Sequence, residues 1–183
     1  MPAPNDPRTI WLVREVAVLL NAMCDAGVIT DYALFGGAAQ MRYTEPVATL
    51  DADVLISVPT PQRTDVLGPI FEFCRARGYE PERESVRVGA WPVQFVPVFN
   101  QLTRHALAAA ETVDFEGVPF RVVSAAHLAV IALSVGRAKD LARVLALMES
   151  GAVRREEVAA LAAREGLGDA WDRFSVRFFD ERR

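Results

Sequence analysis

The chain has 183 residues, and 51% of them are apolar, which is enough to bury the core of one domain without disulfides or structural metals. Its net charge of −4 argues against a surface that binds nucleic acid non-specifically, because such surfaces are strongly basic. No apolar run approaches the roughly 20 residues of a membrane-spanning helix and the first residues lack a signal-peptide pattern, so we expect a cytoplasmic protein with no membrane partner.

The first third of the chain predicts two helices and two strands in alternation. Periodic apolar positions predict a helix that begins at Pro7 and ends before Gly27. In chain order there follow a strand over 32–35, a helix over 38–42 and a strand over 49–58. Gly36-Gly37 lies at the turn between the first strand and the second helix.

The rest of the chain predicts more strands and then only helices. The expected elements are a helix over 60–78 with a break at Gly68-Pro69, strands over 85–88 and 92–98, a helix over 101–110, hairpin strands over 112–115 and 118–123, and helices over 125–135, 138–149, 155–164 and 168–178. This order favours an α+β fold with a mixed sheet flanked by helices over residues 1–123. A helical portion over 124–183 is expected to pack on this core and to form one compact unit with it.

Gly36-Gly37 and the pair Asp51 and Asp53 carry the chemistry that the sequence predicts. Alternate residues of a strand point to the same face, so Asp51 and Asp53 present two carboxylates side by side. Like charges at this spacing are costly unless a cation neutralises them, and Mg²⁺ prefers carboxylate and phosphate oxygens. Glycines at a strand-to-helix turn let the backbone approach a phosphate closely. The pattern therefore favours a metal-dependent site for a nucleoside triphosphate.

Each part of this pattern also has a simpler interpretation. Paired glycines at a strand end usually mark a turn, and an Asp-x-Asp on an exposed strand edge is usually solvated surface. Asp51 and Asp53, however, interrupt an apolar strand, which makes simple exposure less natural. Lys139 is the only lysine among 20 basic residues, and with Arg137 and Asp140 it is either part of a binding site or the solvated start of a helix.

Together these residues resemble the DNA polymerase β-type nucleotidyltransferase superfamily, and within it the bacterial AbiEii-like and related uncharacterised nucleotidyltransferase-like proteins. Those proteins have an apolar-Gly-Gly turn and, after a spacer of similar length, Asp-x-Asp with apolar flanks. Thr49 stands two residues before Asp51, as in the family's frequent Arg-x-Thr-x-Asp-x-Asp run. The segment 127–141 is similar to the family's helical segment ending in Arg-x-Lys-Asp-Leu, and the order of elements agrees over about residues 32–147.

The resemblance implies a nucleotidyltransferase-like fold and a role for each motif. Asp51 and Asp53 would be catalytic and would hold Mg²⁺ or Mn²⁺. Gly36 and Gly37, with Thr49 beside them, would line the site of the nucleoside triphosphate.

The resemblance also places the segment with Arg137, Lys139 and Asp140 close to the same cleft. Lys139 would contact phosphate, and Asp140 would orient it by hydrogen bonding.

One expected catalytic position departs from the family pattern. The family's third carboxylate usually sits in a later strand between apolar residues, and Gln94 stands at that position here. A neutral amide neither accepts a proton at pH 7 nor holds a metal strongly. Glu84 and Asp114 are the other candidates for a third acid, although neither has the expected flanking residues.

The sequence leaves three kinds of function open. The first is an enzyme that transfers a nucleoside monophosphate from a nucleoside triphosphate to a hydroxyl acceptor, which would be a tRNA end, a protein or a small molecule. By resemblance, such an enzyme would be a toxin of a toxin–antitoxin or phage-defence pair, with an antitoxin protein as its partner. The second is a degenerate, catalytically weak or inactive relative that binds a nucleotide or a partner. In the third, the Gly-Gly and Asp pairs are incidental to a structural protein.

Overall fold

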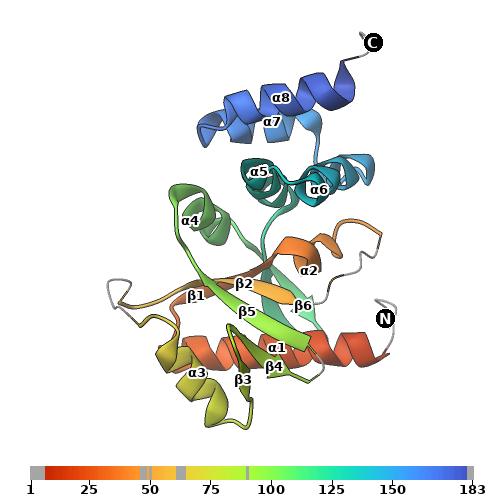
Figure 1. Cartoon of the computed structure of the whole chain (residues 1–183). Helices are drawn as coiled ribbons and strands as arrows, with labels where there is room; N and C mark the ends of the chain where they lie inside the picture. The colour runs from red at the N-terminus through yellow and green to blue at the C-terminus, as the bar shows by residue number, and fades with distance from the viewer. Residues whose placement is uncertain (1–6, 46–48, 50, 61–64, 90, 181–183) are drawn as a thin grey trace.

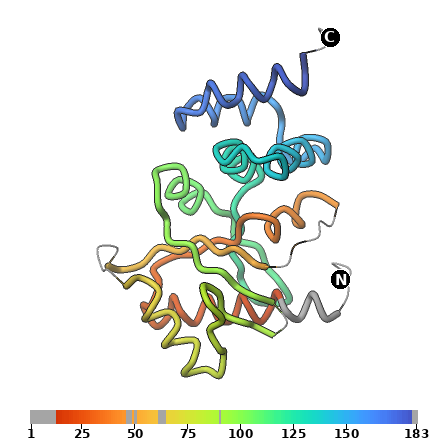
Figure 2. Tube along the Cα trace, viewed as in Figure 1, coloured from red at the N-terminus to blue at the C-terminus, as the bar shows by residue number. Residues whose placement is uncertain are grey.

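The computed structural model of the protein describes residues 7–45, 49, 51–60, 65–89 and 91–180, and the side chains of the first helix from residue 13 onward. A mixed sheet lies between helix α1 (Pro7–Asp25) on one side and a stack of helices on the other (Figure 1). The last two helices of the chain lie at the end of the molecule opposite α1, as the trace in Figure 2 also shows.

Seven strands form the sheet within the described residues, and their pairing is both parallel and antiparallel. They are β1 (Asp31–Phe35), β2 (Ala52–Ser57), β3 (Pro81–Glu82), β4 (Ser85–Val88), β5 (Trp91–Pro97), β6 (Glu111–Phe115) and β7 (Val118–Val122). Their spatial order is β3-β4-β5-β2-β1-β7-β6. β2 runs parallel to β5, β1 runs parallel to β7, and the other neighbours are antiparallel. β2 is therefore the central strand.

Helices cover both faces of the sheet. After α1 they are α2 (Gly36–Gln40), α3 (Gly68–Arg75), α4 (Gln101–Ala108), α5 (Ala125–Val135), α6 (Ala138–Glu149), α7 (Arg155–Arg164) and α8 (Gly168–Phe179). α1 packs against β4 and β7, while α4 packs against β1 and β2. α5 is apolar on nearly all sides and contacts α2, α4, α6, α7 and α8, as expected of a helix that is buried all round.

The apolar run of β2 explains its central position. Val54, Leu55 and Ile56 are all fully buried, although consecutive strand residues point to opposite faces. A strand that is covered on both faces reads as a continuous apolar run, as this one does. Asp53 therefore stands in the best-covered strand of the sheet, next to the fully buried Ala52.

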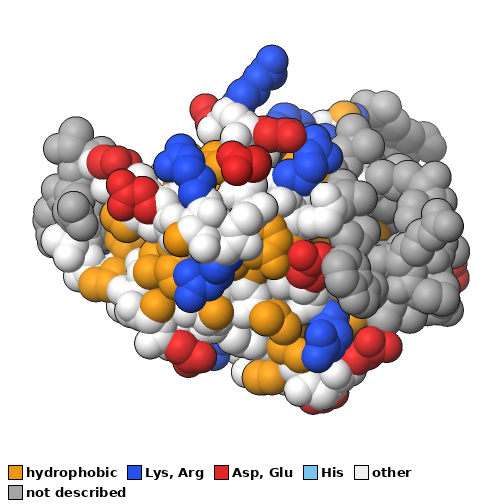
Figure 3. Space-filling view, turned by 90° about the horizontal axis from the view of Figure 1, so that it is seen from below, with side chains coloured by type: hydrophobic (Ala, Val, Ile, Leu, Met, Phe, Trp, Pro, Cys, Tyr) orange, Lys and Arg blue, Asp and Glu red, His pale blue; other side chains and the backbone are white. Residues whose placement is uncertain are grey.

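The described part of the chain shows neither a membrane-spanning helix nor, on the face drawn in Figure 3, a basic patch. In the part of the chain that the structure describes, no helix combines the length and the apolar character of a membrane span. On the face seen from below, basic and acidic side chains are scattered among apolar ones rather than gathered by sign (Figure 3). The drawn part of that face thus lacks the basic field that attracts nucleic acid.

The predicted fold class, α+β with a mixed sheet flanked by helices, is confirmed. The helices predicted over 125–135, 138–149 and 155–164 have these bounds in the structure. The strand predicted from Thr49 is shorter, since β2 begins at Ala52. The second helix begins earlier than predicted, at Gly36 rather than Ala38.

The region before α3 departs most from the prediction. The predicted helix over 60–78 is wrong at its start, because residues 65–67 are not helical and α3 begins at Gly68; residues 61–64 lie outside the described part. Pro69 lies in the first turn of α3, where its missing N–H group needs no partner, so it starts a helix rather than kinking one. The two-residue strand β3 was not predicted, because so short a strand has no detectable periodicity.

Candidate functional site

The site begins at the turn where β1 ends and α2 begins. Gly36 has φ +68°, a left-handed conformation that side chains disfavour. A Cβ at Gly36 would collide with Oδ2 of Asp53 and would lie 3.3 Å from the Cβ of Asp53. Two features thus require glycine at position 36: the left-handed backbone angle, and the carboxylate of Asp53 that lies against the α-carbon.

The next glycine faces the loop that leads into β2. A Cβ at Gly37 would lie 3.0 Å from Oγ1 of Thr49. Thr49 donates a hydrogen bond from Oγ1 to the carbonyl oxygen of Asp51 at 3.0 Å, and the same hydroxyl lies 3.5 Å from Oδ1 of Asp51. Thr49 therefore fixes the residues before β2 beside the glycine turn, which brings Asp51 next to Asp53.

The two aspartates differ in their surroundings. Asp51 is exposed just before β2, whereas Asp53 is half-buried within it. Burial raises the pKa of Asp53 above its ordinary value, and the charge of Asp51 adds to this effect. The positive charges of Arg143 and Lys139 lower the same pKa, and both residues line one cavity with Asp53.

The pair fits a metal that arrives with a phosphate ligand better than a metal held by protein alone. Within the described residues, no group of three or more His, Cys, Asp and Glu side chains is placed to hold a metal ion. Mg²⁺ commonly takes only one or two carboxylates and completes its octahedron with substrate phosphates and water. Asp51 and Asp53 supply that number of carboxylates.

Gln94 lies beside Asp53, where a third acid was expected. β5 runs parallel to β2, and Gln94 is the register partner of Asp53, so the two side chains share a face of the sheet. Neither alternative acid takes its place. Glu84 is exposed in the turn between β3 and β4, and Asp114 lies on the edge strand β6, where its Oδ1 accepts a hydrogen bond from the N–H of Gly117.

The second wall of the site is the start of α6. Gly136 ends α5 with φ 71°, a left-handed C-cap that lets the chain reverse directly into α6. Asp140 is only 2% exposed, and it accepts a hydrogen bond from Nε of Arg137 at 2.6 Å. Oδ1 of Asp140 also lies 3.6 Å from Nη1 of Arg143, as an ion pair. Asp140 therefore orients Arg137 and Arg143 rather than Lys139. Because Asp140 is buried and paired, it does not belong to a simple solvated helix start.

Arg143 belongs to the site but was missed in the sequence. Its side chain is 19% exposed, and its Nε donates a hydrogen bond to Oε1 of the buried Gln40 at 3.0 Å. This bond ties α6 to the end of α2, next to the Gly36-Gly37 turn. The sequence did contain a signal, because Arg143 follows Lys139 by four residues and so lies on the same face of the helix.

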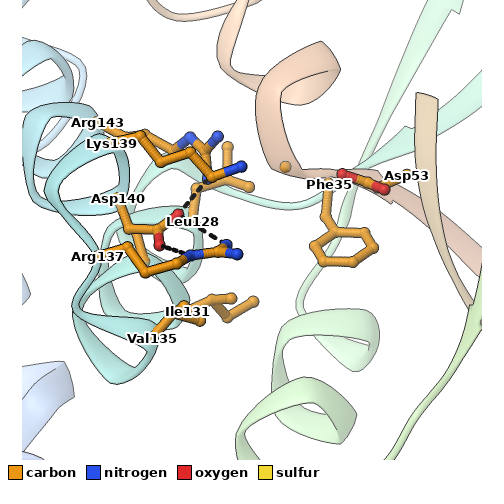
Figure 4. Close-up of a pocket in the computed structure, with 11 residues that line it drawn as sticks. Phe35, Asp53, Leu128, Ile131, Val135, Arg137, Lys139, Asp140 and Arg143 are labelled. Carbon is orange, nitrogen blue, oxygen red and sulfur yellow. Dashed lines mark hydrogen bonds and ion pairs between the residues drawn. The ribbon is translucent and has the colours of Figure 1, made fainter. Parts of the chain in front are cut away.

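A cavity of about 120 Å³ joins the two walls (Figure 4). It is lined by Phe35, Gly36, Asp53, Leu128, Ile131, Ala132, Val135, Arg137, Lys139, Asp140 and Arg143. Figure 4 shows Asp53 on one side and the start of α6 on the other. The structure thus brings together residues from the glycine turn, from β2 and from the segment 137–140. Gly37, Thr49 and Asp51 do not line the cavity, but Gly37 contacts Thr49, and Thr49 is bonded to Asp51.

The fold is similar to that of solved structures. Neither a scan of protein-family models nor a search of curated proteins found a match. Among solved structures, an antigenic nucleotidyltransferase-like protein from Paracoccidioides brasiliensis matches with a TM-score of 0.55 and 16% identity, over 88% of this chain and 92% of that one. The antibiotic-resistance factor ANT(2'')-Ia matches with a TM-score of 0.53 and 14% identity, over 94% and 99% of the two chains. At such identities the similarity shows the fold alone, and that fold is nucleotidyltransferase-like.

Proposed function

We propose that this protein is a nucleotidyltransferase that binds a nucleoside triphosphate with Mg²⁺ or Mn²⁺ and transfers the nucleoside monophosphate to a hydroxyl group. One observation carries the proposal: the carboxylate of Asp53 lies against the α-carbon of Gly36, beside Asp51, and faces Lys139 and Arg143 across a cavity. Carboxylates for a metal and cations for a polyphosphate are thus collected around a turn that admits close backbone approach.

The residues have distinct roles in this proposal. Asp51 and Asp53 would hold the metal, which supplies neutralisation of phosphate charge and a lower pKa for the acceptor hydroxyl when it is bound. Gly36 and Gly37 would admit the phosphates to the turn. Lys139, Arg137 and Arg143 would bind the polyphosphate oxygens.

The proposed reaction is a substitution at the α-phosphorus. The oxygen of the acceptor hydroxyl forms a bond to this phosphorus, the bond to the oxygen that bridges to the β-phosphate breaks, and pyrophosphate leaves. The hydroxyl proton passes to solvent. Catalysis of this kind is mostly positioning and charge stabilisation, which suits a site made of two carboxylates, a glycine turn and three cations.

A second candidate rests on Gln94. An amide in register with Asp53 cannot take the acceptor's proton. In this second candidate the fold serves as a weak or inactive module that binds a nucleotide or a partner. Replacing Gln94 by Asp separates the two functions. If the protein is an inactive module, Gln94→Asp creates or raises transfer; if it is an enzyme in which Gln94 has another role, the substitution lowers transfer.

The transfer assay uses each of the four nucleoside triphosphates labelled at the α-phosphate, with Mg²⁺. The acceptors offered are tRNA, total cell protein and a panel of small hydroxylated molecules that includes antibiotics, since one protein of similar fold is an antibiotic-resistance factor. Label that moves to an acceptor with the wild type and not with Asp53→Asn supports the enzyme. Mg²⁺-dependent nucleotide binding without transfer supports the module, and neither binding nor transfer would favour a structural protein.

The more specific family relationship and the biological role of the protein are further proposals. The AbiEii-like resemblance of the sequence suggests a toxin of a toxin–antitoxin or phage-defence pair, with an antitoxin protein as partner. Expression without any partner gene tests this role: growth arrest that disappears in Asp51→Asn/Asp53→Asn supports a toxin, and an unchanged growth curve argues against one. We also propose that residues 1–123 and 124–183 act as one unit, because the cavity is lined from both.

A further inference from the structure

The cavity has a polar part and an apolar part, and the proposed function uses only the polar one. The polar part is lined by Gly36, Asp53, Arg137, Lys139, Asp140 and Arg143. The apolar part is lined by Phe35 of β1 and by Leu128, Ile131, Ala132 and Val135 of α5. A polyphosphate would contact the polar part alone, which leaves the apolar part available to an apolar group of the same ligand.

Phe35 differs in burial from the other apolar side chains of β1, and part of it packs against the core. Tyr32, Ala33 and Leu34 are buried in the core, whereas Phe35 is only half-buried. Phe35 is the register partner of Asp53 in the pair of β1 and β2, so both side chains lie on the same face of the sheet. Figure 4 shows the ring of Phe35 directed into the cavity, on the side away from the carboxylate of Asp53.

The wall opposite Phe35 is apolar and open to a ligand. Ile131 and Val135 are four residues apart on α5 and so share one face of that helix. Val135 is 49% exposed, so about half of its side chain is accessible to a ligand. Arg137 lies across the cavity from Phe35 in Figure 4, and its guanidinium is held by Asp140.

A nucleoside triphosphate has the two chemical ends that this cavity requires. Its polyphosphate is anionic and its base is a flat, largely apolar ring. Aromatic side chains and arginine planes are the usual partners of such rings, because stacking needs only a π-face. We propose that Phe35 is the stacking platform for the nucleobase, with the apolar side chains of Ile131 and Val135 on the other side of the ring.

This inference rests on the proposed function, and the test separates the two. Binding of Mg²⁺–ATP and of Mg²⁺–tripolyphosphate, which has no base, is measured by titration calorimetry on the wild type and on Phe35→Leu and Phe35→Tyr. Phe35→Leu keeps an apolar side chain but removes the ring, so ATP affinity should fall by roughly 5- to 100-fold while tripolyphosphate affinity stays unchanged. Phe35→Tyr keeps the ring and should bind both ligands as the wild type does.

A matched control is Phe115→Leu, which removes a half-buried ring from the edge strand β6 and should change neither affinity. Three results would overturn the inference: Phe35→Leu that binds ATP as tightly as the wild type, Phe35→Leu that loses both ligands to the same degree, or a wild type that binds ATP no better than tripolyphosphate. If the wild type binds ATP no better than tripolyphosphate, the result still supports the polyphosphate site. A wild type that binds neither ligand would instead overturn the proposed function, and the stacking platform with it.

Discussion

Asp53 and Gly36 are in direct contact. The carboxylate of Asp53 lies where a side chain on residue 36 would be. This contact joins the central strand β2 to the turn that follows β1. It also puts a negative charge next to a backbone that is free to approach a ligand.

The contact predicts that Gly36→Ala destabilises the protein more than backbone strain alone would. Gly27 provides the matched control, because its φ of +67° is nearly the same as that of Gly36 and a Cβ there would have no heavy atom within 4 Å. Gly27→Ala should lower the free energy of unfolding by about 1–2 kcal/mol, the cost of a left-handed residue with a side chain. Gly36→Ala should lower it further, because its Cβ must displace Asp53. Urea denaturation measures the free energy of unfolding of both variants. Equal losses would contradict the contact between Gly36 and Asp53.

The pair of Arg137 and Asp140 is expected to stabilise the start of α6. Asp140→Asn removes the charge of a buried group that pairs with two arginines, so the free energy of unfolding should fall by about 1.5–3 kcal/mol. The control is Glu157→Gln, because Arg154 and Glu157 form the same i,i+3 pair at the start of α7 but on the surface, and it should cost less than about 1 kcal/mol. Chemical denaturation at neutral pH compares the two variants. A smaller loss for Asp140→Asn than for Glu157→Gln would mean that burial does not strengthen this pair.

Asp53 should make the metal-free protein less stable as the pH rises. Burial, and then the charge of Asp51, raises its pKa in the folded chain above the ordinary 3.8. The folded state therefore binds this proton more tightly, and the resulting stabilisation is present below the ordinary pKa and is lost as the pH rises through the folded pKa. Asp53→Asn carries no titrating group, so it should gain stability relative to the wild type between pH 3.5 and pH 7 without Mg²⁺.

Urea denaturation at the two pH values checks this prediction. The control is Asp172→Asn on α8, an exposed residue whose substitution should change the unfolding free energy by less than about 0.5 kcal/mol at either pH. A difference between Asp53→Asn and the wild type that does not change with pH would contradict the raised pKa.

Much of the fold was predictable because its signals are local. α5 and α6 have the predicted bounds, since Ser124 begins a nearly continuous apolar run in α5, α6 has a clear apolar period, and Gly136 separates the two helices. The start of α3 was not found, because Thr60-Pro61 also looks like a helix start. The N–H of Gly68 is satisfied by Oδ1 of Asp65 at 2.7 Å, a capping signal that the sequence contained but that competed with an equally good one.

The site was predictable only in part, because its contacts join distant segments. Resemblance to a family pointed to Gly36, Asp53 and Lys139, which line one cavity. The bond between Gln40 and Arg143 spans 103 positions, so the sequence does not show that these two residues meet, although the spacing of Lys139 and Arg143 places both on one helix face. Phe35 reads as the end of an ordinary core strand, since the sequence does not show that its ring is left half-buried beside the carboxylate.

Arg143 is expected to bind the polyphosphate. Arg143→Gln should weaken the affinity for Mg²⁺–tripolyphosphate by roughly 10- to 100-fold, the loss expected for a hydrogen bond to a charged group. Arg173→Gln is the control, because Arg173 is exposed on α8 at the far end of the helical stack, and it should leave the affinity unchanged. Calorimetry on variants with a native circular dichroism spectrum measures both. Equal affinities for Arg143→Gln and the wild type would limit Arg143 to its structural bonds with Gln40 and Asp140.

The central claim is a Mg²⁺-dependent nucleotide site at Asp51 and Asp53, and a thermal-shift panel tests it most directly. ATP, GTP, CTP and UTP are each added with and without Mg²⁺ to the wild type and to Asp51→Asn/Asp53→Asn, and each shift is taken relative to the same protein without ligand. A ligand that binds only the folded state at 100 times its Kd stabilises it by about 2.7 kcal/mol. We expect a rise in Tm that requires Mg²⁺ and disappears in the double variant. No shift with any of the four nucleotides, or the same shift in the double variant, would contradict the account.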